Sequence, residues 1–109
     1  MGVVELTNEN FEHEVLGSKV PVLIDFWASW CGPCQMQASI VDAIEKEMGD
    51  RVKICKLNVD EQPKLAMNYQ IASIPTLVFM KYGLFQGRMV GLQEQKTIQD
   101  QLEKLCEES

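Results

Sequence analysis

The fold is decided by the stretch Asp25-Phe26-Trp27-Ala28-Ser29-Trp30-Cys31-Gly32-Pro33-Cys34-Gln35. An almost continuously apolar run at 20–24 precedes it, and an apolar segment with helical periodicity follows it directly. This order predicts a buried strand, a tight turn and two cysteines in the first turn of the next helix. A Cys-x-x-Cys pair beside a strand–helix–strand pattern indicates a redox-active dithiol.

The length of 109 residues predicts one domain, 1–109, with a core of two or three layers. Apolar residues make up 46% of the chain, so folding needs neither a metal nor structural disulfides. The net charge of −6 argues against nucleic-acid binding, which requires clustered Lys and Arg. No apolar run reaches the roughly 18 residues of a membrane span, and the amino terminus lacks a secretory-signal pattern. We therefore expect a cytoplasmic monomer that does not bind membranes.

Alternating strands and helices predict an α/β fold. The expected strands are 3–6, 20–27, 52–59, 76–80 and 86–90, and the expected helices run from residue 7 or 8 to 16, from the Cys-Gly-Pro-Cys turn to 48, over 63–69 and from about 94 to 106. The strands at 20–27 and 52–59 should be parallel, because a long helix connects them. The last two strands should form an antiparallel hairpin. In the first helix we expect Phe11, Val15 and Leu16 to point inward.

The spacing of the cysteine pair suits disulfide exchange. At a helix start, Cys31 would be exposed to the unpaired N–H groups and positive dipole end, which lower a thiol pKa. Cys34 would be buried one turn further on, as the thiol that resolves a mixed disulfide. Gly32 and Pro33 carry no charge, which favours a reductant over a strong oxidant. Cys55 and Cys106 are expected to pack as small apolar side chains, and His13 to be a solvated surface residue.

Asp25 is an acid at the end of a strand that is otherwise built for burial. One interpretation is a hydrogen-bonded acid at a strand end. The other is a carboxyl with a raised pKa that exchanges protons with Cys34. Lys56, an isolated cation in the next apolar strand, is its expected partner, unless the ammonium group reaches solvent instead.

Ile74-Pro75-Thr76 precedes the third central strand. Pro75 could simply begin that strand, or its peptide bond could be cis, which occurs almost only before proline and usually in a tight turn. A cis turn beside the dithiol would expose the backbone of Ile74 for pairing with an extended substrate segment.

The motifs resemble the thioredoxin family in both order and spacing over essentially the whole chain. They are Phe26-Trp27-Ala-x-Trp30-Cys31-Gly32-Pro33-Cys34, Lys56-Leu57-Asn58-Val59-Asp60, Ile74-Pro75-Thr76-Leu77 and Val90-Gly91. The resemblance implies a central mixed sheet of four to five strands flanked by four helices. It also implies a general protein-disulfide reductase that cycles between a Cys31/Cys34 dithiol and disulfide through a mixed disulfide. Such a protein needs no cofactor beyond that disulfide, acts on disulfide-containing client proteins and is re-reduced by a thioredoxin reductase, which could be flavin- or ferredoxin-linked.

The resemblance also implies roles by position. Cys31 is the nucleophile, Cys34 the resolving thiol, Asp25 and Lys56 the buried proton-handling pair, and Pro75 the cis proline. The apolar surface around the dithiol, which we call the docking rim, would comprise Trp30, Gly32, Pro33, Val59, Ile74, Val90, Gly91 and Leu92. Disulfide isomerase domains resemble Cys-Gly-His-Cys and glutaredoxins Cys-Pro-Tyr-Cys, and neither sequence is present.

Two positions depart from the family pattern. Gln35 stands where the family commonly has a lysine, so we expect weaker stabilisation of the Cys31 thiolate. Ser39 stands where the family often has a proline that bends the long helix, so that helix should be straighter.

Two other classes of function remain as alternatives. A metal module would need two further ligands, and His13, Cys55 and Cys106 are unsuitably spaced, so we expect no metal. A binding protein could use the apolar rim alone, with redox chemistry incidental.

Overall fold

The computed structural model describes residues 2–108; Met1 and Ser109, the ends of the expected domain, lie outside the described residues. Five strands form a mixed sheet in the order β1-β3-β2-β4-β5. Their bounds are β1 Val4–Glu5, β2 Val22–Trp27, β3 Lys53–Asn58, β4 Thr76–Lys81 and β5 Leu84–Val90. The helices are η1 Glu12–Leu16, α1 Gly32–Met48, the short η2 Gly49–Arg51, α2 Pro63–Asn68 and α3 Gln95–Glu107. The expected α/β thioredoxin fold is therefore confirmed.

Strand β2 is the centre of the sheet because it is apolar on both faces. It pairs in parallel with β3 and antiparallel with β4, and its residues from 22 to 26 are all buried. Parallel pairing of β2 and β3 across α1 confirms the predicted strand–helix–strand unit, and β4 and β5 form the predicted hairpin. The hairpin turn needs left-handed backbone, which Tyr82 (φ 53°) and Gly83 (φ 76°) supply.

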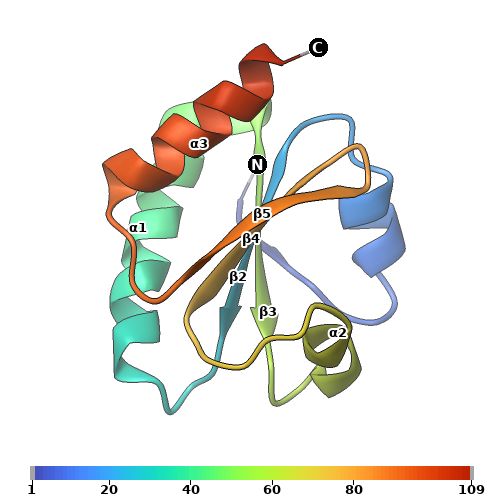
Figure 1. Cartoon of the computed structure of the whole chain (residues 1–109), viewed down its shortest axis with the longest axis vertical. Helices are drawn as coiled ribbons and strands as arrows, with labels where there is room; N and C mark the ends of the chain where they lie inside the picture. The colour runs from blue at the N-terminus through green and yellow to red at the C-terminus, as the bar shows by residue number, and fades with distance from the viewer. Residues whose placement is uncertain (1, 109) are drawn as a thin grey trace.

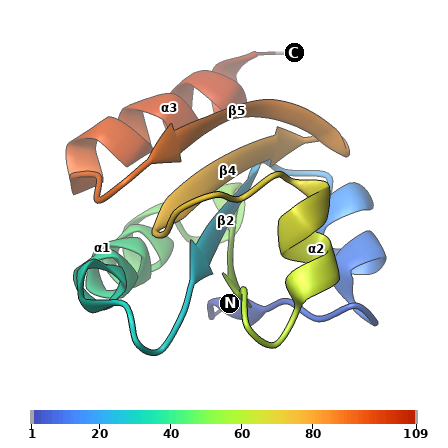
Figure 2. The same ribbon diagram turned by 60° about the horizontal axis from the view of Figure 1, so that its bottom comes forward.

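Helices cover both faces of the sheet, α1 and α3 on one side and η1 and α2 on the other (Figures 1 and 2). Alternate residues of each strand point to opposite faces, so the sheet builds two apolar cores. The core under α1 and α3 contains Leu23, Val41, Ile44, Met48, Val52, Ile54, Leu77, Phe79, Ile98, Leu102 and Leu105. The core under η1 and α2 contains Leu6, Phe11, Val15, Val22, Ile24, Phe26, Cys55, Leu57, Leu65, Val78 and Met80.

Helix α1 carries the Cys-Gly-Pro-Cys motif at its first turn. Pro33 occupies one of the first two helical positions, where a missing N–H removes no hydrogen bond. The helix continues without interruption through Ser39 and ends at Gly49, whose φ of 58° suits glycine, as predicted. Helix α3 begins after Glu94, a residue type that caps helices poorly, and the Glu94 side chain makes no capping hydrogen bond.

The first helix differs from its prediction. Thr7 does cap a turn, because its hydroxyl accepts a hydrogen bond from the Asn10 N–H (3.2 Å). The helix that follows is a five-residue π-helix closed by a bond from the Gly17 N–H to the Glu12 carbonyl. Leu16 is 43% exposed, so its predicted inward position is wrong. Leu16 is the last residue of the helix and lies with its backbone against Gly83, so its side chain stays at the surface.

Within the described residues, no helix has the length and apolar character needed to cross a bilayer.

Cys55 and Cys106 carry free thiols in different surroundings. Cys55 is fully buried on β3, and burial raises its thiol pKa to about 12. Cys106 is half-buried on α3.

We expect iodoacetamide at pH 8 to label Cys106 but not Cys55 in the folded, oxidised protein, since alkylation needs a thiolate. Mass spectrometry of peptides locates the label. Labelling of Cys55 before the protein unfolds would contradict the burial of this thiol.

Candidate active site

The two cysteines of the motif are joined as a disulfide at the amino-terminal end of α1. Their Cα atoms are 5.3 Å apart. Cys31 is the N-cap residue, with extended backbone, and its sulfur accepts a hydrogen bond from the Cys34 N–H at 3.3 Å. The N-cap sulfur thus takes the place of the usual capping oxygen. The same hydrogen bond and the helix dipole would stabilise negative charge on Cys31 once the disulfide is reduced.

The predicted exposure of Cys31 is wrong for this disulfide state. Cys31 is only 5% exposed and Cys34 2% exposed, so both residues are buried. Their neighbours Gly32 and Pro33 are exposed instead. Cys31 lies beneath the surface because its sulfur contacts the carbonyl oxygen of Ile74, at 3.8 Å. Position on the helix therefore distinguishes the two sulfurs more clearly than exposure does.

Asp25 lies on β2 with its side chain on the face covered by α1. It shares that face with Leu23, because alternate strand residues point the same way. The residue is 0% exposed, and neither carboxyl oxygen has a hydrogen-bond partner among the described residues. The interpretation as a satisfied strand-end acid is therefore excluded.

Lys56 is the register neighbour of Asp25 on β3, as the predicted pairing requires. The two side chains make no direct hydrogen bond, because neither carboxyl oxygen of Asp25 has a partner, but the charge of Lys56 still attracts the ionised carboxyl. The Lys56 ammonium lies instead over the indole ring of Trp27, 4.9 Å from the ring centroid. Lys56 is half-buried and reaches toward the surface along the aromatic face, where a cation is attracted to the ring.

The surroundings of Asp25 favour its neutral form. Burial raises its pKa from 3.8 to about 7, the attraction of Lys56 opposes that rise, and the nearby charges of Asp42 and Glu5 add to it. A carboxyl with a pKa near neutrality can release and accept a proton at physiological pH. This is the property expected of the buried acid.

A cavity of about 270 Å³ opens beside the resolving cysteine. Its walls include Cys34, Lys56 and Trp27, with further lining from Ala28, Ser29, Gln35 and Ala38. The cavity adjoins Cys34 and the Lys56 ammonium, and Lys56 is the strand neighbour of Asp25. It is large enough to hold water, which would carry protons between this region and the surface. This opening could not be predicted from the sequence, since Trp27 and Ala38 belong to separate elements.

The Ile74–Pro75 peptide bond is cis, as the sharper of the two interpretations predicted. The turn brings the carbonyl of Ile74 to Cys31, and the Pro75 carbonyl accepts a hydrogen bond of 2.8 Å from the Gly91 N–H. Residues from three separate parts of the chain therefore meet at the dithiol.

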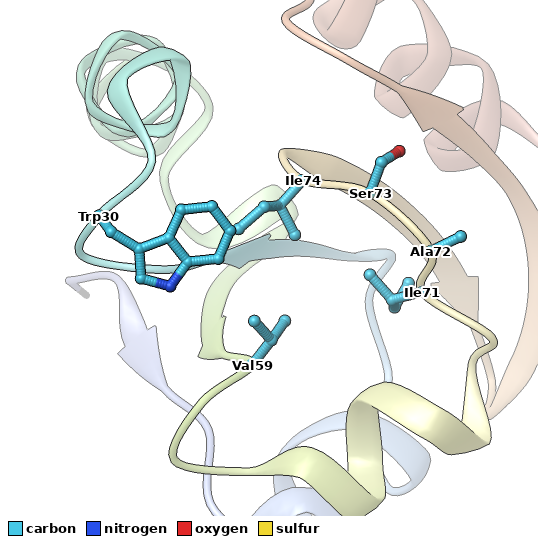
Figure 3. Close-up of a pocket in the computed structure, with 6 residues that line it drawn as sticks. All are labelled: Trp30, Val59, Ile71, Ala72, Ser73 and Ile74. Carbon is cyan, nitrogen blue, oxygen red and sulfur yellow. The ribbon is translucent and has the colours of Figure 1, made fainter.

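An apolar pocket of about 380 Å³ lies beside the dithiol (Figure 3). Its lining residues are Trp30, Val59, Ile71, Ala72, Ser73 and Ile74. Trp30 is 70% exposed, and a hydrogen bond of 2.8 Å from its indole nitrogen to Asp60 holds the ring at the pocket edge. The sequence predicted three of these residues. Ile71, Ala72 and Ser73 were missed, although they directly precede the Ile74–Pro75 turn.

The remaining rim residues complete this surface. Val90 and Leu92 are exposed, and Gly91 is tied to the cis-proline turn. Among the described residues, no three His, Cys, Asp or Glu side chains are grouped closely enough to hold a metal ion.

The chain matches the family model described as Thioredoxin over residues 2–104. It is 45% identical over 102 residues to "Thioredoxin" of Rickettsia typhi, a match that covers 94% of this chain and 97% of the relative. It is 46% identical over 99 residues to "Thioredoxin 1" of Synechococcus elongatus, covering 91% and 92%. "Thioredoxin" of Porphyra purpurea is 41% identical over 104 residues, a match that covers 95% of this chain and 97% of the relative.

The raised pKa of Asp25 predicts a pH-dependent cost to stability. The carboxyl ionises near 3.8 in the unfolded chain and near 7 in the folded one. The folded state therefore loses stability as pH rises from about 4 to 7, by roughly 4 kcal/mol in total, because one pKa unit corresponds to about 1.4 kcal/mol. Asp25→Asn cannot ionise, so its stability relative to the parent should increase by that amount over this range.

Urea unfolding of the oxidised proteins at a series of pH values measures this difference. Asp100→Asn, the same chemical change at an exposed acid, is the matched control for the loss of one carboxyl. A pH-independent difference for Asp25→Asn would show that this carboxyl is ionised in the folded state as readily as in the unfolded one.

Proposed function

The chain belongs to the thioredoxin family and is a thiol–disulfide oxidoreductase, and we propose that Cys31 is the thiolate that attacks the disulfides of client proteins. The observation that carries this assignment is the hydrogen bond from the Cys34 N–H to the Cys31 sulfur at the N-cap of α1. Only the N-cap sulfur receives this donor and the end of the helix dipole. Cys34 lies one turn into the helix and is assigned as the resolving thiol.

The reaction transfers two electrons from the dithiol to the client disulfide. The Cys31 thiolate attacks one client sulfur, a Cys31–client disulfide forms, and the other client sulfur leaves as a thiolate that takes a proton from solvent. Cys34 then loses its proton and attacks the Cys31 sulfur. The second client thiolate leaves, and the Cys31–Cys34 disulfide forms. The dithiol itself carries the electrons, so the cycle uses no additional cofactor.

Asp25 is proposed to accept the proton of Cys34 in the second step. It lies buried under α1, and burial holds its pKa at about 7, so its carboxylate is a competent base near neutral pH. Lys56 attracts the ionised form of Asp25, which is the form that accepts the proton from Cys34. The cavity beside Cys34 gives water a path between the surface and this region. When a reductase reopens the disulfide, Asp25 returns the proton to Cys34.

The docking rim is proposed to hold an extended client segment against the cis turn. The backbone of Ile74 would pair with that segment, as in strand addition, and the pocket between Trp30 and Ile71 would take an apolar side chain. Gly32 and Pro33 present no large side chain next to the sulfur, so a client disulfide can approach closely. The supporting observation is that the pocket adjoins Ile74, whose carbonyl contacts Cys31.

The setting that fits this activity is the cytoplasm, with the protein acting as a monomer. A reducing compartment keeps isolated thiols such as Cys55 and Cys106 free, as they are here. The partners would be disulfide-containing clients and a thioredoxin reductase, either flavin- or ferredoxin-linked. The net charge of −6 disfavours nucleic acid and anionic membranes as partners.

Single cysteine variants test the roles directly. Cys31→Ser should abolish insulin reduction with dithiothreitol as electron donor, because the attacking thiolate is absent. Cys34→Ser should attack once and then remain as a covalent complex with insulin, which intact-mass spectrometry detects. Cys106→Ser, a change remote from the motif, is the control and should keep parental turnover. A Cys31→Ser protein with undiminished turnover, or trapping through Cys34 in place of Cys31, would refute the assignment.

A further inference from the structure

Gln37 is a fully buried polar residue that the exchange reaction does not use. It lies on α1, one helical turn after Cys34, and its side chain is 0% exposed. Its amide nitrogen donates to the carbonyl oxygen of Gln93 (3.1 Å), and its amide oxygen accepts from the N–H of Gln93 (2.8 Å). The amide nitrogen and the amide oxygen of Gln37 are therefore both hydrogen-bonded to the backbone of Gln93, 56 positions further along the chain.

Gln93 extends this connection to the docking rim. Its side-chain amide donates to the carbonyl oxygens of Val90 (3.2 Å) and Gly91 (3.4 Å). Gly91 in turn donates to the carbonyl of Pro75 in the cis turn. A continuous series of hydrogen bonds thus runs from the helix that carries the dithiol to the loop that carries Val90, Gly91 and Leu92, and on to the turn beside Cys31.

Among the described residues, the hydrogen bonds that hold the loop at 91–94 are mostly those of Gln37 and Gln93. This loop lies between the end of β5 and the start of α3, and α3 begins without a side-chain cap at Glu94. Gly91, with a φ of 88°, contributes no side chain that could anchor the loop. Burying an amide is costly unless its hydrogen bonds are made, and an apolar side chain would fill the same space on α1 without that cost. The polar side chain is therefore better explained by what it holds than by packing.

We propose that Gln37 is a positioning residue for the exchange reaction: it holds the 91–94 loop, next to Val90, in the conformation that docks client proteins. This inference rests on the proposed docking role of the rim. Gln37 does not touch the sulfurs, so it acts through Gln93 and the loop. If the loop is already ordered, no entropy is lost in ordering it when the client binds. Loss of that order would therefore weaken the affinity for the client.

Gln37→Met tests the proposal, because methionine has a similar length and shape but cannot make either hydrogen bond. Gln95→Met is the matched control. Gln95 also links α3 to α1, through a hydrogen bond to Glu47 (2.9 Å), and its other side-chain hydrogen bond goes to Gln99 within α3 and not to the 91–94 loop. Both variants therefore lose the hydrogen bonds of one glutamine side chain, but only Gln37→Met loses hydrogen bonds to the docking loop.

The assay is single-turnover oxidation of the reduced proteins by increasing concentrations of insulin, which separates the half-saturating concentration from the maximal rate. For Gln37→Met we expect the half-saturating concentration to rise about fivefold, the scale of one lost hydrogen bond of about 1 kcal/mol. The maximal rate should stay within about twofold, and the rate with hydroxyethyl disulfide, which is too small to use the rim, should not change. Hydrogen exchange of the Gly91 amide should accelerate. Gln95→Met should match the parent in all four measurements.

Leu92→Asp, on the rim itself, separates the possible failures. If it weakens insulin binding while Gln37→Met has parental affinity and parental Gly91 exchange, the role of Gln37 is overturned and docking by the rim stands. If neither variant changes the half-saturating concentration, docking by the rim is overturned, and the role of Gln37 with it. A Gln37→Met protein that loses only thermal stability would also overturn the proposal. Should it not fold, Gln93→Ala removes the next link from a half-buried loop residue and must raise the same concentration.

Discussion

A carboxyl group without a hydrogen-bond partner is buried in the central strand of this protein, and the rest of the site depends on it. Such a group is costly when ionised, and burial shifts the Asp25 pKa to about 7, where the neutral form is accessible. The neighbouring strands hold Asp25 in place, with β3 on one side and β4 on the other. The fold therefore keeps, on the face of the sheet that carries the dithiol helix, a carboxyl whose pKa suits the proton exchange that we propose for it.

The dithiol is built from elements that are far apart in sequence. Helix α1 supplies both sulfurs, the cis turn at Ile74–Pro75 contacts Cys31, and the end of β5 is tied to that turn through Gly91. Figure 2 shows these segments at the same end of the sheet, where β2 runs into α1 and the chain turns into β4. Gln37 adds a tie across this end, from the dithiol helix to the loop after β5. The dithiol and the proposed docking rim are thus joined by these contacts.

Much of this arrangement could be predicted because its causes are local. The apolar run before Asp25, the proline in the first turn of α1 and the glycine at its end specify β2 and α1 by short-range rules. The cis bond at Pro75 was one of two interpretations that the local sequence left open, and the family resemblance favoured it. Leu16 was mispredicted because helical periodicity assumes a regular α-helix, and the chain forms a five-residue π-helix there.

The remaining features depend on contacts between distant segments. Lys56 faces Asp25 in register, but the indole of Trp27 attracts its ammonium group, and strand patterns do not specify that choice. Cys31 is buried because Ile74, 43 residues away, lies against its sulfur. In the sequence Gln37 is an ordinary polar helix residue, and only the structure shows its two hydrogen bonds to the backbone of Gln93. Sequence patterns locate the chemistry, whereas the three-dimensional packing sets its proton and docking partners.

Direct titration of Asp25 tests whether it is the proton-exchanging carboxyl that we propose. Isotope-edited NMR of the Asp25 side-chain carboxyl carbon, followed from acid to alkaline pH in the disulfide form, reports its ionisation without relying on activity. The account predicts a midpoint near pH 7, at about the pKa that burial gives this group. A midpoint close to the ordinary value of 3.8 would show that the carboxyl is already ionised well below neutral pH, and would contradict the account.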